Sequence, residues 1–321
     1  MAIELRASVT RSEPTKKTLA RQARQGRLRR RFGDTPTAWA YVFPAALIIL
    51  GLSLIPMVWS FILSLQNADL ITTPEWVGMK NYQTLEKDPD FRAAIVHTLA
   101  YTALLVPSSI AGGLGLALLL NRKIRFIGVY RTLIFVPFII SATAQGVLFS
   151  FILDPHFGLA NNVLTWFGIP PQGFLSDSNQ ALFLLALIGL WSGVGFCVVV
   201  YLAALQDISH ELIEAAALDG AQRWATFRYV VWPALGPVTV FLLVWQTLQS
   251  LQFFDLVFVT TRGGPLQSTT TIVFFVWNQA FQLFNAGYGA AAAYVLTFAL
   301  LVLTIFVRIG RRRADRSGGA S

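Results

Sequence analysis

Long apolar blocks separated by short polar segments dominate the hydropathy pattern of this chain. Each block is about as long as the roughly 20 residues that a helix needs to cross about 30 Å of hydrocarbon. None of the blocks alternates apolar and polar residues, as a strand of a membrane barrel must. The pattern therefore predicts an all-α polytopic membrane protein with six transmembrane helices. The expected spans lie at about residues 39–65, 94–120, 132–153, 181–205, 234–259 and 289–309.

One shorter apolar segment, residues 271–285, complicates this count. Four amide side chains interrupt it, so we interpret it as a helix on the outer face or a re-entrant helix. The gaps between the blocks run about 10–30 residues, which is too short for an inserted soluble domain. We therefore expect one membrane domain, residues 36–310, between two basic cytoplasmic tails, residues 1–35 and 311–321.

Composition supports this interpretation, and charge sets the orientation. Of the 321 residues, 55% are hydrophobic and 13% are charged, whereas an ordinary soluble domain is about 25% charged. The formal net charge is +9, and 21 of the 25 Lys and Arg residues lie in the two tails or in the gaps after the second and fourth spans. Basic segments stay in the cytoplasm, so we expect both termini inside and assign the charge to topology rather than to nucleic acid. Residues 1–35 have no apolar stretch of the kind a cleavable signal peptide carries.

The sequence carries no catalytic or metal-binding constellation that we can recognise. It has no GxxxxGK[ST] phosphate loop and no GxSxG elbow. His97, His156 and His210 are too far apart to form a metal motif such as HExxH. The single cysteine, Cys197, lies in an apolar block, and we interpret it as a small hydrophobic residue. We expect no enzyme activity, metal or bound cofactor, and no proton-coupled pump, because Asp255 is the only acid near a span that could serve one.

Residues 206–233, between the fourth and fifth spans, are the most informative segment. Asp207 or Ser209 can cap a helix that has two glutamates in its first turns, where negative charge is favourable. Three consecutive alanines then favour helix with little side-chain bulk, and Gly220 permits a turn that a Cβ would hinder. A second short helix leads to Pro233. The segment therefore predicts a cytoplasmic helix–turn–helix with a smooth face for another protein, although an ordinary loop with an amphipathic helix would also fit.

Part of this segment resembles the EAA motif of ABC importer permeases. That motif reads EAA, three residues, Gly, nine residues, Ile, one residue and Leu-Pro. Here residues 214–216, Gly220 and Pro233 match, while the apolar Val230 and Trp232 replace the usual Ile and Leu. Nearly the whole chain resembles the maltose-type, or carbohydrate-uptake, permease subfamily. The blocks that carry it are VGMKNYQTLEKDPDF, LNRKIRFIGVYRTLIFVPF, YLAALQDI and FFDLVFVTTRGGP.

The resemblance implies a permease subunit of an ATP-driven, binding-protein-dependent importer in the bacterial cytoplasmic (inner) membrane. In such importers a second, different permease completes the pathway and an extracytoplasmic solute-binding protein delivers the substrate. Two ATPase subunits on the cytoplasmic side use ATP and Mg, so this chain would bind no cofactor itself. The EAA segment would be the coupling helix, which moves the spans when the ATPase pair closes. The residues that would contact the ATPase are Glu214, Ala215, Ala216, Asp219 and Gly220.

A polar face on the fifth span is a candidate substrate path. At helical spacing it carries Gln246, Gln249, Ser250 and Phe253. Amides and a hydroxyl suit sugar hydroxyls and an aromatic ring suits a sugar face, but the same groups could instead join neighbouring helices. Gln252 lies off this face. The resemblance implies cavity positions at Gln246, Ser250, Phe253, Ser192, Gly193 and Phe196. Residues 260–265 would form an outer turn where the binding protein docks.

The substrate and some alternatives stay open at this point. A sugar or oligosaccharide is the leading hypothesis, with glycerol 3-phosphate or glycerophosphodiesters as alternatives in the same subfamily. The partner permease could hold most of the substrate contacts. A secondary transporter or channel working alone would require internal repeats and functional charges in the spans, and neither is evident. A membrane enzyme would require a catalytic constellation, which the sequence does not show.

Overall fold

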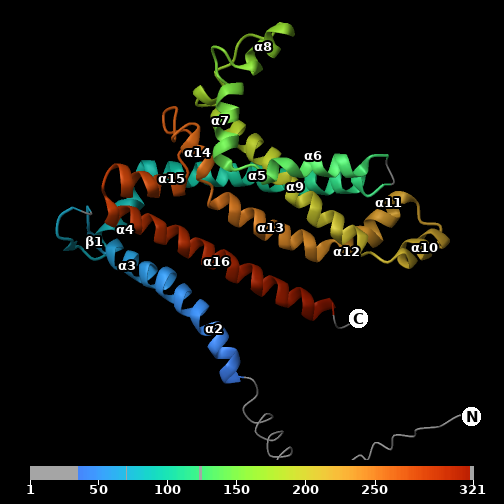
Figure 1. Ribbon diagram of the computed structural model, residues 1–321, viewed down its shortest axis with the longest axis horizontal. Coiled ribbons are helices and arrows are strands. Elements are labelled where there is room, and N and C mark those ends of the chain that lie inside the picture. The colour runs from blue at the N-terminus through green and yellow to red at the C-terminus, as the bar shows by residue number, and fades with distance from the viewer. Residues whose placement is uncertain (1–34, 70, 123–124, 319–321) are drawn as a thin grey trace, which may run out of the picture. The chain divides into compact units, whose positions relative to one another are not determined.

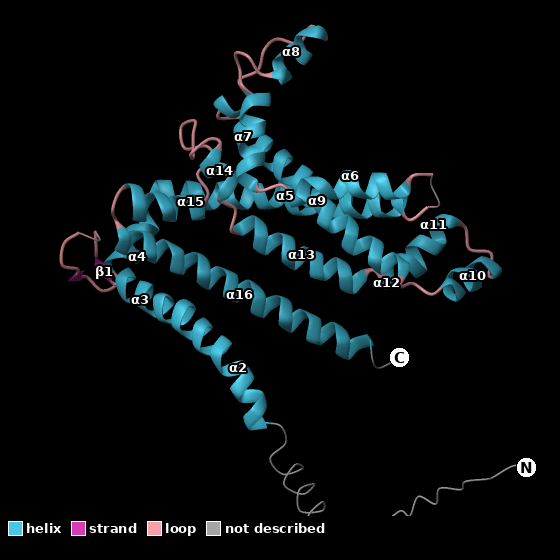
Figure 2. Ribbon diagram, viewed as in Figure 1, coloured by secondary structure: helices cyan, strands magenta, loops and turns pink. Residues whose placement is uncertain are grey.

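The structure, a computed structural model, describes residues 35–318 apart from residues 70 and 123–124. Helices dominate this part of the chain (Figure 2). Its only strands, β1 (Gln66–Asn67) and β2 (Glu75–Trp76), form a short antiparallel pair. The prediction of an all-α protein is therefore confirmed. The basic tail expected over residues 1–35 lies outside the described residues except for Thr35.

The first expected span is one helical run. It consists of α2 (Thr35–Ile49), the π-helical turn η1 (Leu50–Leu54) and α3 (Ile55–Ser64). Residues Tyr41–Ser64 are long enough to cross a membrane, and their most apolar stretch has a mean hydropathy of 2.4. The π turn ends two residues before Pro56, which cannot donate a backbone hydrogen bond and would crowd the preceding turn of a regular helix. The chain divides into two units after Ser60, and all sites described below lie within the second unit.

Four more helical runs are long and apolar enough to cross a membrane, and they match expected spans. They are α5 (Pro89–Leu120), α9 (Ala181–Gln206), α13 (Gly236–Leu251) with α14 (Asp255–Val259), and the first part of α16 (Ala286–Gly318). Asp88 starts α5 by accepting hydrogen bonds from the backbone N–H groups of Asp90 and Phe91. Because α16 continues to Gly318, the residues expected as a C-terminal tail prolong the last helix up to that point.

The third expected span is bent. In place of one straight helix over residues 132–153, α6 (Ile127–Ile139) and α7 (Ala142–Ile152) meet at an angle of 98° (Figure 1). Ile140 ends α6 with an extended backbone, at φ −69° and ψ 133°. The described residues therefore contain five candidate spans, or six if the bent pair is counted as one.

Two side chains hold this bend, which we call the corner (residues 139–142). Ser141 caps α7 by accepting a hydrogen bond from the backbone N–H of Ala144 at 3.3 Å. The side-chain amide of Gln145 donates to the carbonyl oxygens of Pro137 at 3.0 Å and Ile140 at 2.8 Å. These carbonyls lie at the end of α6, where no further helical turn can satisfy them. The corner is thus a hydrogen-bonded element rather than a disordered break.

Shorter helices connect the spans. Between the long runs lie α4 (Lys80–Lys87), α8 (Leu159–Trp166), the 3₁₀ turn η2 (Phe174–Ser176), α15 (Ile272–Trp277) and the π-helical η4 (Asn278–Gln282). Between α9 and α13 lie α10 (His210–Leu218), α11 (Arg223–Thr226), the π-helical η3 (Phe227–Val231) and α12 (Trp232–Ala234). The segment 271–285 is therefore helical over most of its length. Its position at the outer face stays a prediction.

Helices α5 and α9 pack side by side at the centre of the second unit (Figure 1). They run parallel, because Tyr101 meets Gly189 and, farther along both helices, Gly113 meets Cys197. A Cβ atom on Gly113 would lie 2.5 Å from the Cβ of Cys197, so this approach requires a glycine. Close helix contact through small residues is typical of membrane proteins. Cys197 is buried, and this packing contact accounts for it.

Candidate functional site

A cavity of about 450 Å³ lies where α5, α9, α13 and the corner meet. The polar side chains that line it are Gln145, Ser192, Gln246, Gln249, Gln252 and Asp255. The aromatic side chains that line it are Tyr101, Phe138, Trp245, Phe253 and Phe254. The lining thus combines polar and aromatic groups, and convergent polar groups of this kind can orient a small molecule.

Helices α9 and α13 bring four of the expected path residues into this cavity. Gln246 and Gln249 line it from α13, and Ser192 and Gly193 line it from α9. Gln246 is buried, and a Cβ atom at Gly193 would lie 3.7 Å from its side-chain nitrogen. The two helices thus approach each other closely at the cavity wall. That these residues contact substrate stays a prediction.

Phe253, the fifth expected residue in the cavity, stacks on Tyr101 of α5. Their ring centroids are 3.9 Å apart and the ring planes differ by 12°. Phe253 lies just beyond α13, which ends at Leu251. Gln252 also lines the cavity, although helical spacing placed it off the polar face. The reason is that the chain leaves helical geometry after Leu251, so the positions that follow no longer obey the period of the helix.

Ser250 and Phe196, the other two expected path residues, do not line this cavity. Ser250 is buried, and its hydroxyl donates a hydrogen bond to the carbonyl oxygen of Thr247 at 3.0 Å. Phe196 lies behind the wall, with ring centroids 5.4 Å from Phe138 and 5.6 Å from Trp245. Both therefore support neighbouring groups in this structure.

Sequence reasoning missed several lining residues that other helices supply. Gln145 reaches the cavity because the corner turns α7 toward it. Tyr101 comes from α5 and Trp245 from the side of α13 next to the polar face. No spacing rule links these positions, because they meet only through helix packing. Asp255 was noticeable in the sequence as an acid near a span end, and the structure places it at the cavity in the first turn of α14.

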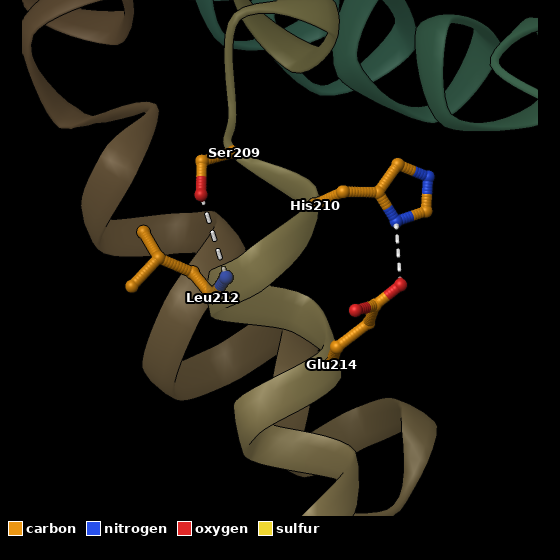
Figure 3. A network of polar contacts seen from close by, with 4 residues as sticks. All are labelled: Ser209, His210, Leu212 and Glu214. Carbon is orange, nitrogen blue, oxygen red and sulfur yellow. Dashed lines mark hydrogen bonds and ion pairs between the residues drawn. The ribbon is translucent and has the colours of Figure 1, made fainter.

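The second candidate site is α10 and the turn that follows it, and Figure 3 shows the polar contacts at the start of this helix. Of the two possible caps, Ser209 is the one used, since its hydroxyl accepts a hydrogen bond from the backbone N–H of Leu212 at 3.4 Å. His210 Nδ1 lies 3.8 Å from Glu214 Oε1 one turn later. Both side chains are exposed, so this pair adds little stability even when His210 is protonated.

The end of α10 is closed by a Schellman motif. The N–H of Ala221 donates to the carbonyl oxygen of Ala216 at 2.9 Å, and the N–H of Gly220 donates to that of Ala217 at 3.1 Å. Gly220 has a φ of +80°, which confirms the expected turn at this glycine. Both ends of α10 are therefore hydrogen-bonded, which satisfies backbone groups that a short exposed helix would otherwise leave to water.

No residue of α10 is buried. Of the residues proposed to contact an ATPase, Ala216 is half-buried and Glu214, Ala215, Asp219 and Gly220 are exposed. Large apolar side chains are also exposed here, with Leu218 at 90%, Tyr229 at 77% and Trp224 at 73%. Exposed apolar groups concentrated in one segment are typical of an interaction surface.

Comparison with known proteins places this architecture in a family. Residues 109–317 match the family model of the binding-protein-dependent transport system inner membrane component. The chain is 35% identical over 274 residues to the lactose transport system permease protein LacF of Rhizobium radiobacter, covering 83% of this chain and 91% of LacF. It is 32% identical over 271 residues to the sn-glycerol-3-phosphate transport system permease protein UgpA of Pectobacterium atrosepticum, with 83% and 91% covered.

A solved structure shows the same fold. The chain superimposes with a TM-score of 0.79 and 25% identity on one chain of a bacterial ABC transporter involved in the import of the acidic polysaccharide alginate. The match covers 89% of this chain and 99% of that one. One assignment follows from the apolar helices, the extent of the family match and the similarity to this solved structure. The chain belongs to the binding-protein-dependent transport system inner membrane components, and it is a multi-pass inner-membrane permease of an importer of this class.

Proposed function

We propose that this permease imports an uncharged sugar or oligosaccharide and that its cavity forms half of the translocation pathway. The lining of the 450 Å³ cavity is the observation that carries this proposal. The amides of Gln246 and Gln249 and the hydroxyl of Ser192 can each donate and accept hydrogen bonds, as sugar hydroxyls require. Phe253 is partly exposed and is held by its stack on the buried ring of Tyr101, so its ring can offer an aromatic surface to the apolar face of a sugar.

Asp255 favours an uncharged substrate over a phosphorylated one. Its carboxylate lines the cavity, and no Lys, Arg or His is among the described residues that do so. A phosphate ester is negatively charged, and like charges repel strongly where little water separates them. The named substrates of related transporters include lactose for LacF, glycerol 3-phosphate for UgpA and an acidic polysaccharide for the structural relative. The related transporters are thus named for neutral and for negatively charged substrates, and the local lining supports the neutral sugar, with glycerol 3-phosphate or a glycerophosphodiester as the second candidate.

A second, homologous permease supplies the other half of the pathway in this proposal. The resemblance to the carbohydrate-uptake subfamily supports a heterodimer, because that subunit type pairs with a different permease. An extracytoplasmic binding protein docks at the outer turn, residues 260–265. The hydroxyl of Thr269 donates to the carbonyl oxygen of Gly264 at 2.8 Å, and the backbone N–H of Thr269 donates to that of Gly263 at 3.1 Å. These bonds give the turn a fixed shape, as a docking site needs.

We further propose that two separate ATPase subunits bind the α10 segment and use ATP and Mg, so that this chain catalyses no reaction itself. Residues 206–233 and both termini then lie in the cytoplasm, in agreement with the distribution of Lys and Arg. Closure of the ATPase pair moves α10, and the helices that follow transmit this movement to α13 and the cavity. The exposure of α10 and its two capped ends support this role.

The test is transport by the importer assembled from this permease and the subunits that copurify with it from native membranes. Recovery of ATPase subunits and accumulation of a labelled neutral sugar, such as lactose, would support the proposal. Accumulation of glycerol 3-phosphate without any neutral sugar would overturn the substrate assignment. The absence of any ATPase subunit from the purified complex would overturn the coupling assignment.

The Asp255→Asn variant refines this test. We expect it to increase the uptake of glycerol 3-phosphate relative to that of the sugar, because it removes the negative charge and keeps a polar group of similar size. A matched control is Asp154→Asn, since Asp154 lies outside this cavity and accepts backbone hydrogen bonds from His156 and Phe157. A similar change in both variants would show that the cavity carboxylate does not determine the selectivity.

A further inference from the structure

A second cavity, of about 270 Å³, lies between α6 and α9. The two helices touch at Gly195 and Ile134, where a Cβ atom on the glycine would lie 2.5 Å from the carbonyl oxygen of Ile134. From this contact the cavity extends to Arg131 in α6 and to Gln206, the last residue of α9. The other lining side chains are mostly apolar: Ile134, Phe135, Val198, Val199 and Leu202. The cavity is therefore apolar at the end inside the helix pair and polar at the end near the helix termini.

The guanidinium group of Arg131 is incompletely paired. One terminal nitrogen, Nη2, donates to the carbonyl oxygen of Leu120 at 3.3 Å. The Nε nitrogen is buried and has no hydrogen-bond partner among the described residues. No Asp or Glu lines the cavity within that part of the chain. A buried cationic donor without a partner is costly, so the arrangement calls for an anion.

The location of this cavity indicates which anion it receives. Arg131 follows the gap after the second span, where Arg122 and Arg125 are exposed, and this gap lies at the end of two membrane helices. Basic pockets between such helices at the cytoplasmic surface bind anionic lipid headgroups. An arginine fork also matches the oxygens of a phosphate group. The apolar part of the cavity extends toward the middle of the helices, which is where an acyl chain lies relative to its headgroup.

We propose that this cavity is a binding site for an anionic phospholipid. The lipid phosphate accepts hydrogen bonds from Arg131 and an acyl chain packs against the apolar side chains of α6 and α9. Gln206 adds a second polar contact at the headgroup end. Binding stabilises the contact between α6, which leads into the corner, and α9, which lines the transport cavity. The two cavities share no lining residue in the described part of the chain, so this site is separate from the proposed substrate path.

The test uses the permease complex purified from native membranes and reconstituted into nanodiscs of phosphatidylcholine with or without phosphatidylglycerol. Native mass spectrometry after partial lipid removal measures the lipid that each complex retains. We expect retained phosphatidylglycerol to fall about tenfold in Arg131→Gln, as loss of a charge-assisted contact predicts. Arg125→Gln is the matched control, because Arg125 is a nearby exposed arginine that does not line this cavity. Its guanidinium carbon lies 4.9 Å from the centroid of the Phe126 ring. Equal retention in Arg131→Gln and the unmodified protein would overturn the proposal.

Further arms separate the other sources of an anion. Inorganic phosphate is added to complexes in nanodiscs of phosphatidylcholine alone, and the unfolding temperature is measured. If phosphate raises this temperature as much as phosphatidylglycerol does, and Arg131→Gln abolishes the rise, the site takes free phosphate and the lipid assignment is wrong. If Arg131→Gln fails to copurify with the second permease, the arginine pairs with that subunit and the assignment is also wrong. Arg131→Lys keeps the charge in case the glutamine variant misfolds. The lysine variant should retain less phosphatidylglycerol than the unmodified protein and more than Arg131→Gln. Complete loss of the lipid from a folded lysine variant would contradict the proposal.

Discussion

The aromatic rings of Tyr101 and Phe253 stack with their centroids 3.9 Å apart, and both residues line the 450 Å³ cavity. This contact links α5 to the non-helical residues between α13 and α14. A stack of this kind contributes about 0.5–1.5 kcal/mol beyond the burial of the rings. It therefore both shapes the cavity and fixes the end of α13 against its neighbour.

Phe253→Leu should weaken sugar transport by removing this aromatic surface. We expect the KM for uptake to rise roughly two- to tenfold, the factor that corresponds to the stacking energy. Initial uptake rates at a series of sugar concentrations measure it. Tyr101→Phe is the control, because it keeps the stacked ring and removes only the hydroxyl. An unchanged KM in Phe253→Leu would indicate that the stack supports the fold without contacting the substrate.

Gln246→Leu should alter uptake kinetics and leave assembly intact. The amide is buried at the cavity wall, and loss of one hydrogen bond to a substrate costs about 0.5–1.5 kcal/mol, or roughly a two- to tenfold rise in KM. Copurification of the other subunits measures assembly. Ser250→Ala is the matched control on the same helix, since Ser250 does not line the cavity and its hydroxyl donates to the carbonyl oxygen of Thr247 one turn earlier. If Gln246→Leu reduces copurification of the other subunits while the complex that remains has a normal KM, Gln246 joins helices and does not bind substrate.

Gly220→Ala and Gly220→Trp should uncouple transport from ATP hydrolysis. A side chain at a φ of +80° costs about 1–2 kcal/mol, and the indole also adds bulk to the exposed surface that we propose as the docking site. We expect reduced uptake with the first variant and none with the second, while insertion into the membrane stays normal. Gly115→Ala is the control, because its Cβ would meet no atom within 4 Å in a regular helix. Normal uptake by Gly220→Trp would count heavily against the coupling assignment.

The orientation of α10 can be measured by labelling with a membrane-impermeant maleimide. The chain has a single cysteine, Cys197, and it is buried, so the background should be low. Leu218→Cys places a thiol at a position that is 90% exposed. We expect labelling in inside-out vesicles and none in intact cells. Labelling from the outside would place this segment on the wrong side for an ATPase and end the coupling proposal.

Gly113→Ala should destabilise the contact between α5 and α9. The added Cβ would lie 2.5 Å from the Cβ of Cys197, and overpacking of this kind typically costs about 1–3 kcal/mol. Thermal unfolding in detergent should show a lower Tm for this variant. The double variant Gly113→Ala with Cys197→Gly moves the small residue to the other helix and should recover much of the loss. No recovery would mean that the two positions do not share one packing contact.

The spans were predictable because a bilayer requires each of them to be a stretch of about 20 mostly apolar residues. Hydropathy alone therefore located five helical runs close to their observed bounds. The corner depends instead on a few local groups. Pro137 and Ser141 are boundary signals, but they lie within an apolar block that is long enough to cross as a straight helix. The decisive bonds come from Gln145, which the hydropathy pattern treats only as an interruption.

Helical spacing predicted part of the cavity lining. Gln246 and Gln249 were found because they share one face of a regular helix. The same spacing also indicated Phe253, which lines the cavity, and Ser250, which does not; it missed Gln252, which lies just past the end of α13. Tyr101 could not be found at all, because its position depends on how α5 packs against a distant part of the chain. The turn at Gly220, by contrast, was predictable because its bonds involve only neighbouring residues.

The corner also affects how force can pass along the third apolar segment. In a straight helix, tilting one end tilts the other, because a continuous ladder of backbone bonds resists bending. Here the side-chain amide of one residue, Gln145, bonds the two carbonyls across the break. A swing of α6 relative to α7 would break these bonds without breaking a backbone bond inside either helix, and it would also shift the contacts of α6 with α9 and of α7 with α14. The third segment therefore lacks the unbroken backbone ladder that would make α6 and α7 tilt as one rod, and each half is held by its own neighbour, α9 for α6 and α14 for α7.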